Sequence, residues 1–173
     1  MDGPDIQAAV DQALTSGATP DVVLDTVAQV VAAGATALVM SYWNPIERYG
    51  TDRFADRMAS AGGAGVITPD LTPEEAGAWI SATDRAGLDR VFLVAPSSTD
   101  QRIETVAAVT SGFLYAASTM GVTGARTQVS SAAPGLVRRA RALTDLPIAV
   151  GLGVSTGDQA SEVAAYADGV IVG

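Results

Sequence analysis

The sequence predicts an α/β fold: an incomplete (β/α)8, or TIM, barrel of about six parallel strands with intervening helices. Three observations predict it: short apolar runs recur along the chain, a helical pattern follows each of them, and several runs open into glycine loops. The runs are continuously apolar, as is typical of parallel strands covered on both faces. Right-handed helical crossovers between such strands give a parallel sheet.

Two helical patterns precede the first predicted strand. Pro4 suits the first position of one helix, and the second is expected from Pro20 to about residue 32, after Thr19. A helical pattern then alternates with apolar runs to the end of the chain. The six expected strands are residues 37–42, 65–68, 90–95, 113–117, 146–150 and 169–172.

The segments between these strands carry turn and capping signals. Residues 43–45 are predicted to form a loop, and helices are expected over 51–60 and from Asp100. Residues 72–75, Thr-Pro-Glu-Glu, match a capping box with proline at the first helical position. Ser155 and Asp158 are expected to cap the helix after the fifth strand.

Both a doubly wound sheet and a barrel fit this order of elements. About six strands are too few for a barrel of roughly 250 residues. Yet a chain that opens on helices and closes on a strand looks like a barrel cut at both ends. We therefore expect one partial barrel domain over residues 1–173, from the helices before the third barrel strand through the eighth strand.

The composition excludes several kinds of chemistry. The chain has no histidine, no cysteine and no lysine, which excludes imidazole bases, thiol nucleophiles, Schiff bases and the common zinc sites. Acid–base work is left to carboxylates and tyrosines. A net charge of −9 argues against nucleic-acid binding, and the absence of a long apolar run argues against a membrane protein. We expect a soluble, cytoplasmic protein.

Glycine loops at the ends of the late strands indicate a phosphorylated ligand. They lie at residues 121–124 and 151–153 and at Gly173, and glycine lets a phosphate approach backbone N–H groups. Barrels commonly bind phosphate at late strands in this way. For any single loop, an ordinary tight turn is the competing interpretation.

Four polar residues have two interpretations each; Tyr115 lies in the middle of a predicted strand, and the other three lie near a strand end or a helix start. Tyr115 and Tyr42 fit either a ligand site or aromatic packing. Asp70 fits either a functional carboxylate or a turn residue that accepts from nearby backbone N–H groups. Asp2 has an obvious role as a helix cap, so spacing alone does not make it catalytic.

Six motifs, in order over nearly the whole chain, resemble those of the tryptophan synthase alpha chain family. The blocks D-G-P-x-I-Q and G-V-T-G-A-R are the most specific, and V-G-L-G departs from the family's V-G-F-G by one leucine. The motifs are DGPDIQ at 2–7, MSYWNP at 40–45, PDLTPEE at 69–75, APSST at 95–99, YAASTMGVTGAR at 115–126 and VGLG at 150–153.

The resemblance implies a lyase that cleaves indole-3-glycerol phosphate to indole and glyceraldehyde 3-phosphate in tryptophan biosynthesis. It implies no cofactor and no metal, and a beta-chain partner in an α2β2 heterotetramer. By the resemblance, Asp2 stabilises the protonated indole ring, and Tyr115 lies near the substrate. The other implied substrate-binding residues are Tyr42, Thr123, Gly124, Gly153 and Gly173, and those implied to face the beta chain are Asn44, Pro45 and Asp70.

The family's general acid–base is a glutamate on the second barrel strand, which this sequence lacks. We therefore expect the 173-residue chain to be impaired, because losing a general acid typically costs about 10²–10⁴-fold in rate. Two other interpretations remain open. The chain is either a non-catalytic piece that binds the beta chain, or part of another phosphate-binding barrel enzyme.

Overall fold

The structure is a computed structural model that describes residues 3–118, 131–151 and 153–172. The chain divides into two compact units. The first unit is Asp11–Phe92, and the second unit comprises Met1–Val10 and Leu93–Gly173. Each unit holds one parallel sheet, in which the strands follow sequence order.

The sheet of the first unit has the order β1-β2-β3. Its register pairs Val39 with Val66 and Val66 with Arg90, all strands running parallel. Helices α4 and α5 pack together, and α5 also packs on β3. The elements are α2 (Pro20–Ala32), β1 (Leu38–Met40), α3 (Trp43–Tyr49), α4 (Thr51–Ser60), β2 (Gly65–Ile67), α5 (Gly77–Ala86) and β3 (Asp89–Val91).

Helix α2 begins as its sequence predicts. Thr19 is the N-cap and accepts a hydrogen bond from the Val22 N–H at 3.4 Å, and Pro20 follows in the first turn. Because the first N–H groups of a helix have no internal partner, such a cap fixes where the helix starts. The helix buries Leu24 and Val27, which joins it to the core of the first unit.

Two predictions for the first unit are wrong. The expected loop at 43–45 is the first turn of α3, because the Asp70 carboxylate accepts from the Trp43 N–H and caps that turn. Gly50, with φ +99°, then separates α3 from α4. The expected capping box at 72–75 closes a turn instead: Thr72 donates to Glu75 at 3.1 Å, and α5 begins only at Gly77.

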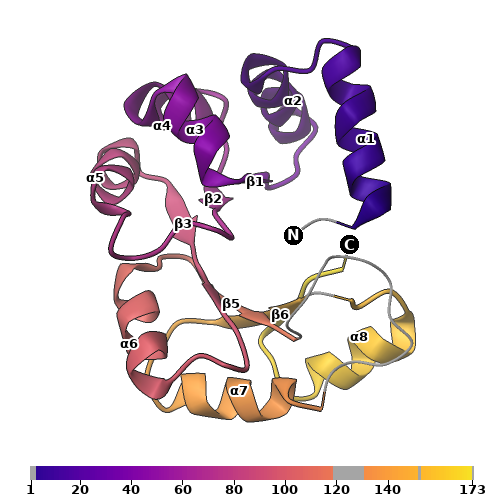
Figure 1. The fold of residues 1–173 in the computed structure, drawn as a ribbon, viewed down its shortest axis with the longest axis vertical. Coiled ribbons are helices and arrows are strands. Elements are labelled where there is room, and N and C mark those ends of the chain that lie inside the picture. Colours follow the sequence, from indigo (N-terminus) through magenta and orange to yellow (C-terminus); the bar gives the residue numbers. More distant parts are fainter. Residues whose placement is uncertain (1–2, 119–130, 152, 173) are drawn as a thin grey trace. The chain divides into compact units, whose positions relative to one another are not determined.

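The second unit carries the sheet β4-β5-β6-β7. Its register pairs Tyr115 with Leu93 on one side and with Ala149 on the other. Figure 1 shows α6, α7 and α8 alongside β5 and β6. The elements are β4 (Leu93–Val94), α6 (Asp100–Val109), β5 (Leu114–Ala117), α7 (Ala133–Arg141), β6 (Ile148–Gly151), α8 (Gly157–Ala164) and β7 (Gly169–Val170).

The predicted strand at residues 90–95 is divided between the two units. Asp89–Val91 forms β3 in the first sheet, and Leu93–Val94 forms β4 in the second, with Phe92 between them. The other five predicted strands are confirmed in place: four are shorter than predicted, and the strand expected at 146–150 is β6 at 148–151, shifted toward the carboxyl end. Apolar runs indicate where a strand lies, but pairing with a neighbour decides its ends.

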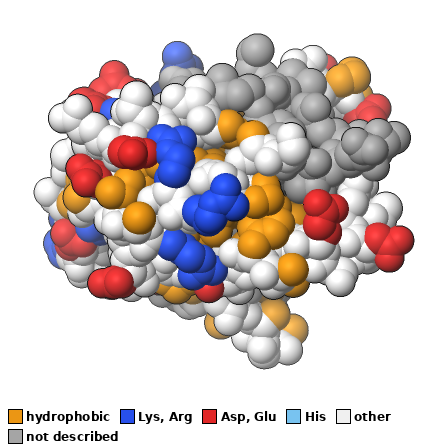
Figure 2. All heavy atoms as spheres, turned by 90° about the horizontal axis from the view of Figure 1, so that it is seen from below, with side chains coloured by type: hydrophobic (Ala, Val, Ile, Leu, Met, Phe, Trp, Pro, Cys, Tyr) orange, Lys and Arg blue, Asp and Glu red, His pale blue; other side chains and the backbone are white. Residues whose placement is uncertain are grey.

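Helix α7 ends in a basic turn. Arg138, Arg139 and Arg141 lie in its last turn, where cations interact favourably with the helix dipole. Figure 2 views the molecule from the side on which α7 lies in Figure 1, and basic side chains gather there between hydrophobic and acidic ones. Arg139 donates to the Asp100 carboxylate at 2.7 Å and also to the Ser98 carbonyl, which ties α7 to the start of α6.

Helix α1 (Pro4–Thr15) begins at Pro4, as predicted, but it buries none of its residues. Its apolar stripe of Ile6, Val10 and Leu14 is exposed to solvent. In the part of the chain that the structure describes, no helix is long and apolar enough to cross a membrane.

Candidate active site

In the second unit, the carboxyl ends of β5 and β6 bring a tyrosine against a glycine. The Tyr115 side chain is only 3% exposed, and its hydroxyl lies over Gly151. A Cβ built on Gly151 would lie 2.2 Å from the Tyr115 hydroxyl oxygen, 2.7 Å from Cζ and 3.0 Å from the Ile171 Cβ. Gly151 therefore leaves the space that the tyrosine ring occupies.

Ser118 lies at the same end of the sheet. It follows β5, is 1% exposed, and donates its backbone N–H to the Gly151 carbonyl at 2.8 Å. Because parallel strands end at the same sheet edge, Tyr115, Ser118 and Gly151 form one polar end of this sheet. This group is the strand-end cluster of the second unit.

The loop after β6 adds backbone donors to this strand-end cluster. Gly153 has φ +90°, a conformation that favours glycine, and the next residue, Val154, is buried. The N–H groups of Gly153 and Val154 have no acceptor among the described residues. Consecutive N–H groups of this kind form a concavity that suits an anion.

The helix after this loop is capped differently from the prediction. Thr156, not Ser155 or Asp158, is the N-cap of α8: its hydroxyl accepts from the Gln159 N–H at 3.3 Å. The Gln159 side-chain oxygen accepts from the N–H groups of Ser155 at 2.7 Å and Thr156 at 3.1 Å. Gln159 thus satisfies those two amides, whereas the N–H groups of Gly153 and Val154 have no acceptor among the described residues.

In the first unit, Asp70 organises the other group of predicted site residues. Its two carboxylate oxygens lie 2.9 and 3.1 Å from the Trp43 nitrogen, which donates to them. Tyr42, Asn44 and Pro45 flank Trp43, and all three are exposed. The structure therefore places Asn44, Pro45 and Asp70, the residues predicted to face the beta chain, around one helix start. Asp70 accepts from a backbone N–H there, as its interpretation as a turn residue predicts.

Four predicted site residues lie outside the described residues: Asp2, Thr123, Gly124 and Gly173. Their assigned roles remain predictions. In the part of the chain that the structure describes, no group of three or more acidic side chains could hold a metal ion.

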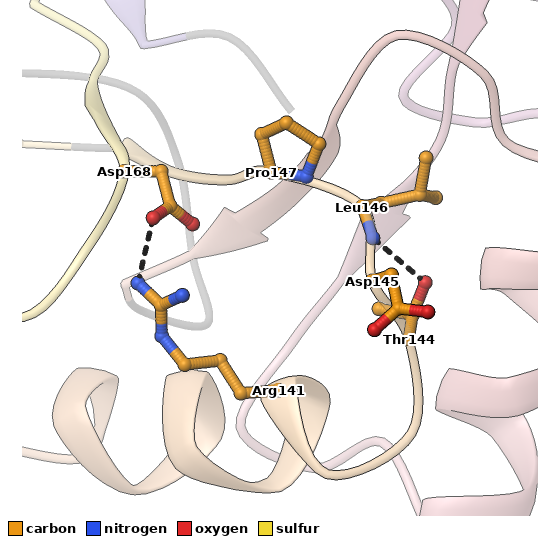
Figure 3. Close-up of a pocket in the computed structure, with 6 residues that line it drawn as sticks. All are labelled: Arg141, Thr144, Asp145, Leu146, Pro147 and Asp168. Carbon is orange, nitrogen blue, oxygen red and sulfur yellow. Dashed lines mark hydrogen bonds and ion pairs between the residues drawn. The ribbon is translucent and has the colours of Figure 1, made fainter.

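A hollow of about 400 Å³ lies at the opposite end of the second sheet (Figure 3). Its lining comes from the end of α7, the segment before β6 and the residue before β7, and comprises Arg141, Thr144, Asp145, Leu146, Pro147 and Asp168. In Figure 3, Arg141 extends from α7 to the Asp168 carboxylate, 2.9 Å from it. The cation of this hollow is therefore already paired, and the amino ends of barrel strands serve stability rather than chemistry.

Asp168 fastens the start of β6 to the start of β7. Its carboxylate accepts from the Ile148 N–H at 2.9 Å, and its own N–H donates to the Ile148 carbonyl at 2.9 Å. The Ile148 N–H, and secondly the Arg141 guanidinium, hold the pKa of Asp168 below its usual value. Nearby, burial raises the pKa of Tyr166, whose hydroxyl has no hydrogen-bond partner in the described part of the chain.

We expect Asp168→Ala to lower the free energy of unfolding by about 1–3 kcal/mol, because the N–H of the fully buried Ile148 loses its acceptor. A carboxyl whose pKa is depressed by folding stabilises the protein above its unfolded pKa and stops doing so as pH falls through the folded value. The difference in free energy of unfolding between Asp168→Ala and the wild type should therefore be largest above about pH 4 and should decrease below that pH. Urea titrations at several pH values measure it.

Asp145→Ala is the matched control for Asp168→Ala, because both aspartates line the same hollow and are exposed, but among the described residues only the Asp168 carboxylate has hydrogen-bond and ion-pair partners. A surface substitution of this kind should change stability by less than about 0.5 kcal/mol. Equal effects of the two substitutions, or a constant Asp168→Ala effect down to pH 2, would contradict the assigned role of Asp168.

Sequence reasoning did not single out Gln159, Ser118 or Val154 as site residues, and it included Gly151 only as part of the glycine loop at 151–153. Gln159 had a readable signal, since Thr156 and Gln159 stand three apart in a capping-box pattern. Ser118 had no signal beyond its place at a strand end, and the contact of Tyr115 with Gly151 had none because it depends on the register of β5 and β6.

Comparison with known proteins identifies what this chain is similar to. A family model described as "Tryptophan synthase alpha chain" matches residues 1–173. The tryptophan synthase alpha chain of Thermobifida fusca is 63% identical over 176 residues, covering all of this chain and 65% of the relative. That of Nocardia farcinica is 60% identical over 173 residues, with the same coverage. The chain thus spans about 65% of the length of these curated relatives.

Solved structures give the same result. A structure of Mycobacterium tuberculosis tryptophan synthase aligns with a TM-score of 0.94 and 54% identity, over all of this chain and 66% of that chain. A structure of the tryptophan synthase α2β2 complex from Pyrococcus furiosus aligns with a TM-score of 0.89 and 32% identity, over 99% of this chain and 70% of that chain. These matches confirm the predicted resemblance and the predicted incomplete TIM-barrel fold class.

Proposed function

Because the chain belongs to the tryptophan synthase alpha chain family, we propose that its protein cleaves indole-3-glycerol phosphate to indole and glyceraldehyde 3-phosphate. This makes it a lyase of tryptophan biosynthesis that works in the cytoplasm. The observation that carries the proposal is the strand-end cluster, in a chain whose whole length matches the family. Tyr115 packs over Gly151 there, and in the loop that follows β6 two backbone amides have no acceptor among the described residues.

In this proposal, the loop after β6 binds the phosphate of the substrate. Gly153 and Val154 supply N–H donors, and the adjacent start of α8 adds the favourable end of a helix dipole. Gln159 keeps the Ser155 and Thr156 amides occupied, so these two do not contribute to the anion site. Thr123, Gly124 and Gly173 complete the phosphate and lid contacts by family resemblance.

The indole ring of the substrate lies beside Tyr115 in this proposal, and Tyr42 is a substrate-binding residue by family resemblance. Cleavage needs a proton on the ring carbon, which makes the ring an electron sink for the breaking carbon–carbon bond. The Asp2 carboxylate accepts a hydrogen bond from the indole N–H and so stabilises the positively charged ring, since a fixed carboxylate stabilises charge that develops in the transition state. The chain's part of the reaction is therefore binding, orientation and charge stabilisation.

The proposed partner is a tryptophan synthase beta chain, which binds the surface around the start of α3. Asn44 and Pro45 are exposed there, and Asp70 fixes the turn that presents them. Docking without catalysis is the second candidate function, and this exposed turn is the observation that favours it. Addition of the 173-residue chain to a beta chain should then change beta-chain activity.

The proposed function is tested by calorimetric binding of indole-3-glycerol phosphate, glycerol 3-phosphate and indole to the 173-residue chain. We expect the first to bind most tightly and the other two to compete with it. Binding of glycerol 3-phosphate without any competition by indole would overturn the proposal in favour of another phosphate-binding enzyme. No binding of any ligand, with a change in beta-chain activity, would favour the docking function.

We expect Tyr115→Phe to weaken indole-3-glycerol phosphate binding about three- to tenfold, because a net hydrogen bond contributes about 0.5–1.5 kcal/mol. Tyr166→Phe is the matched control. Tyr166 belongs to the same unit but lies before β7, at the opposite end of the sheet. Equal weakening by both substitutions, measured in the same titration, would place the ligand elsewhere.

A further inference from the structure

Gln159 is a buried polar residue in the first turn of α8, where it is 8% exposed. Its side-chain oxygen accepts three hydrogen bonds, from the Ser155 N–H at 2.7 Å, the Thr156 N–H at 3.1 Å and the Ser155 hydroxyl at 3.2 Å. The Gln159 N–H donates in return to the Thr156 hydroxyl at 3.3 Å. These bonds close a capping box and fix the backbone of residues 155–156 against the helix.

The fixed backbone continues directly from the two amides that are proposed to bind phosphate. The N–H groups of Gly153 and Val154 have no acceptor among the described residues, and Ser155 is the next residue along the chain. Val154 is buried, so the segment is held by packing on one side and by the bonds to Gln159 on the other. Donors that are held in place before a ligand arrives bind it more tightly, because less freedom is lost on binding.

The second relevant property of Gln159 is that its side chain carries no charge. A capping box is closed by glutamate as well as by glutamine at this position, and a carboxylate would interact more favourably with the helix dipole. A buried carboxylate beside an anion would repel it, however, since Coulomb interactions strengthen as the local dielectric falls. Asp158, the acidic residue in the first turn of α8, is exposed, so solvent and salt screen its charge.

We propose that Gln159 is a positioning residue of the anion site, and that its lack of charge allows the loop after β6 to accept a phosphate dianion. This inference rests on the proposed function, in which that loop binds the phosphate of the substrate. Gln159 fixes residues 155–156 so that the Gly153 and Val154 amides are oriented for the ligand. It does so through hydrogen bonds that a carboxylate could also make, but without a negative charge near the phosphate.

Two substitutions of Gln159 separate its hydrogen bonds from its charge. Gln159→Met has a similar length but no comparable acceptor, so glycerol 3-phosphate binding should weaken about tenfold and the urea midpoint of unfolding should fall. Gln159→Glu keeps the acceptor, so the urea midpoint should stay near the wild-type value, yet binding should also weaken about tenfold at pH 8. A residue with a merely structural role would behave differently, because Gln159→Glu would then restore binding together with stability.

The pH dependence of the Gln159→Glu effect identifies charge as its cause. A phosphate monoester has its second pKa at about 6, so glycerol 3-phosphate is a dianion at about pH 8 and a monoanion at about pH 5. Because the repulsion energy doubles with the charge of the ligand, the weakening by Gln159→Glu should be about threefold at pH 5 and about tenfold at pH 8. The weakening by Gln159→Met should be the same at both pH values. Asp158 and Glu162 are present in every variant, so their titration cancels from these ratios.

Ser161→Glu is the matched control, because it adds the same charge to α8 at an exposed position. It should weaken glycerol 3-phosphate binding by less than about twofold, since solvent screens the interactions of exposed charges. Indole, which is uncharged, should bind Gln159→Glu as tightly as it binds the wild type.

The outcomes distinguish this inference from the proposed function on which it rests. Wild-type affinity of Gln159→Glu for glycerol 3-phosphate, a loss that is equal at both pH values, or an equal loss in Ser161→Glu would overturn the inference and leave the proposed function standing. If the wild-type protein binds no glycerol 3-phosphate, the proposed phosphate site fails, and the role of Gln159 fails with it.

Discussion

Replacing Gly151 by alanine is expected to displace the Tyr115 ring and thereby to weaken ligand binding and stability together. The new Cβ would lie 2.2 Å from the Tyr115 hydroxyl oxygen and 2.7 Å from Cζ, far inside van der Waals contact. Ile171 closes the other side at 3.0 Å, so the methyl group has no alternative space. Overpacking of a buried site typically costs about 1–3 kcal/mol.

The effect on binding should exceed the effect of losing the tyrosine hydroxyl alone. In Tyr115→Phe the ring keeps its place, whereas in Gly151→Ala the ring must move and the strand end changes shape. We expect indole-3-glycerol phosphate binding to fall by about 100-fold, since a displacement near 1 Å can have effects of that order. Calorimetric titration and urea unfolding of the same samples measure both consequences.

A double variant tests the cause directly. Tyr115→Leu shortens the side chain that occupies the space above Gly151. The double variant Gly151→Ala with Tyr115→Leu should therefore lose less stability than the sum of the losses of the two single variants. A favourable coupling energy of about 0.5–3 kcal/mol is expected for groups in contact. Additive effects would mean that the ring and the new methyl group do not collide.

Gly157→Ala is the control for glycine replacement itself. A Cβ there meets nothing within 4 Å, and the residue starts α8 in the same unit. Alanine should be neutral or slightly stabilising at this position, because it favours helix more than glycine does. A loss of binding in Gly157→Ala equal to that in Gly151→Ala would mean that binding responds to general changes rather than to the strand end.

The sequence predicted most of the fold because apolar runs and helix starts are local signals. Thr19 with Pro20 marked the start of α2, and Thr99 caps α6 at Asp100, where a helix was expected. The failures arose where a distant residue decides the local structure. Residues 43–45 became helical because Asp70, 27 positions later, caps their turn.

The candidate site was predictable in its location but not in its contacts. Glycine loops after late strands indicated where the second sheet would end in a site. The Tyr115–Gly151 approach depends on strand register, and the occupancy of the 155–156 amides depends on the Gln159 side chain. Neither follows from the composition of a loop, because both depend on which strand or helix lies beside it.

Trp79→Ala is expected to cause the largest loss of stability in the first unit, about 3–5 kcal/mol. Trp79 is fully buried in α5, and its ring centroid lies 5.8 Å from that of Trp43 and 6.2 Å from that of Phe54. Removing it leaves a cavity among three helices that share this aromatic cluster. This loss is large, because the free energy of unfolding of a typical domain is only about 5–15 kcal/mol.

Trp79→Phe separates the volume of the ring from its polar nitrogen. The Trp79 Nε1 atom is buried and has no hydrogen-bond partner among the described residues, and such a group costs about 1–3 kcal/mol in the folded state. Phenylalanine removes that cost while it keeps most of the aromatic contact. We therefore expect Trp79→Phe to lose less than half as much stability as Trp79→Ala, as measured by urea unfolding.

Trp79→Ala should also loosen the start of α3, which carries the proposed beta-chain surface. Trp43 packs its ring against Trp79 and donates its N–H to Asp70, so loss of Trp79 removes one of the two contacts that hold the start of α3. In Trp79→Ala, Trp43 is the one remaining tryptophan, and its fluorescence should shift to the red as its ring gains water. Leu136→Ala, a core substitution in the second unit, should destabilise without that shift. An unchanged Trp43 emission in Trp79→Ala would mean that the backbone bond to Asp70 holds the turn by itself.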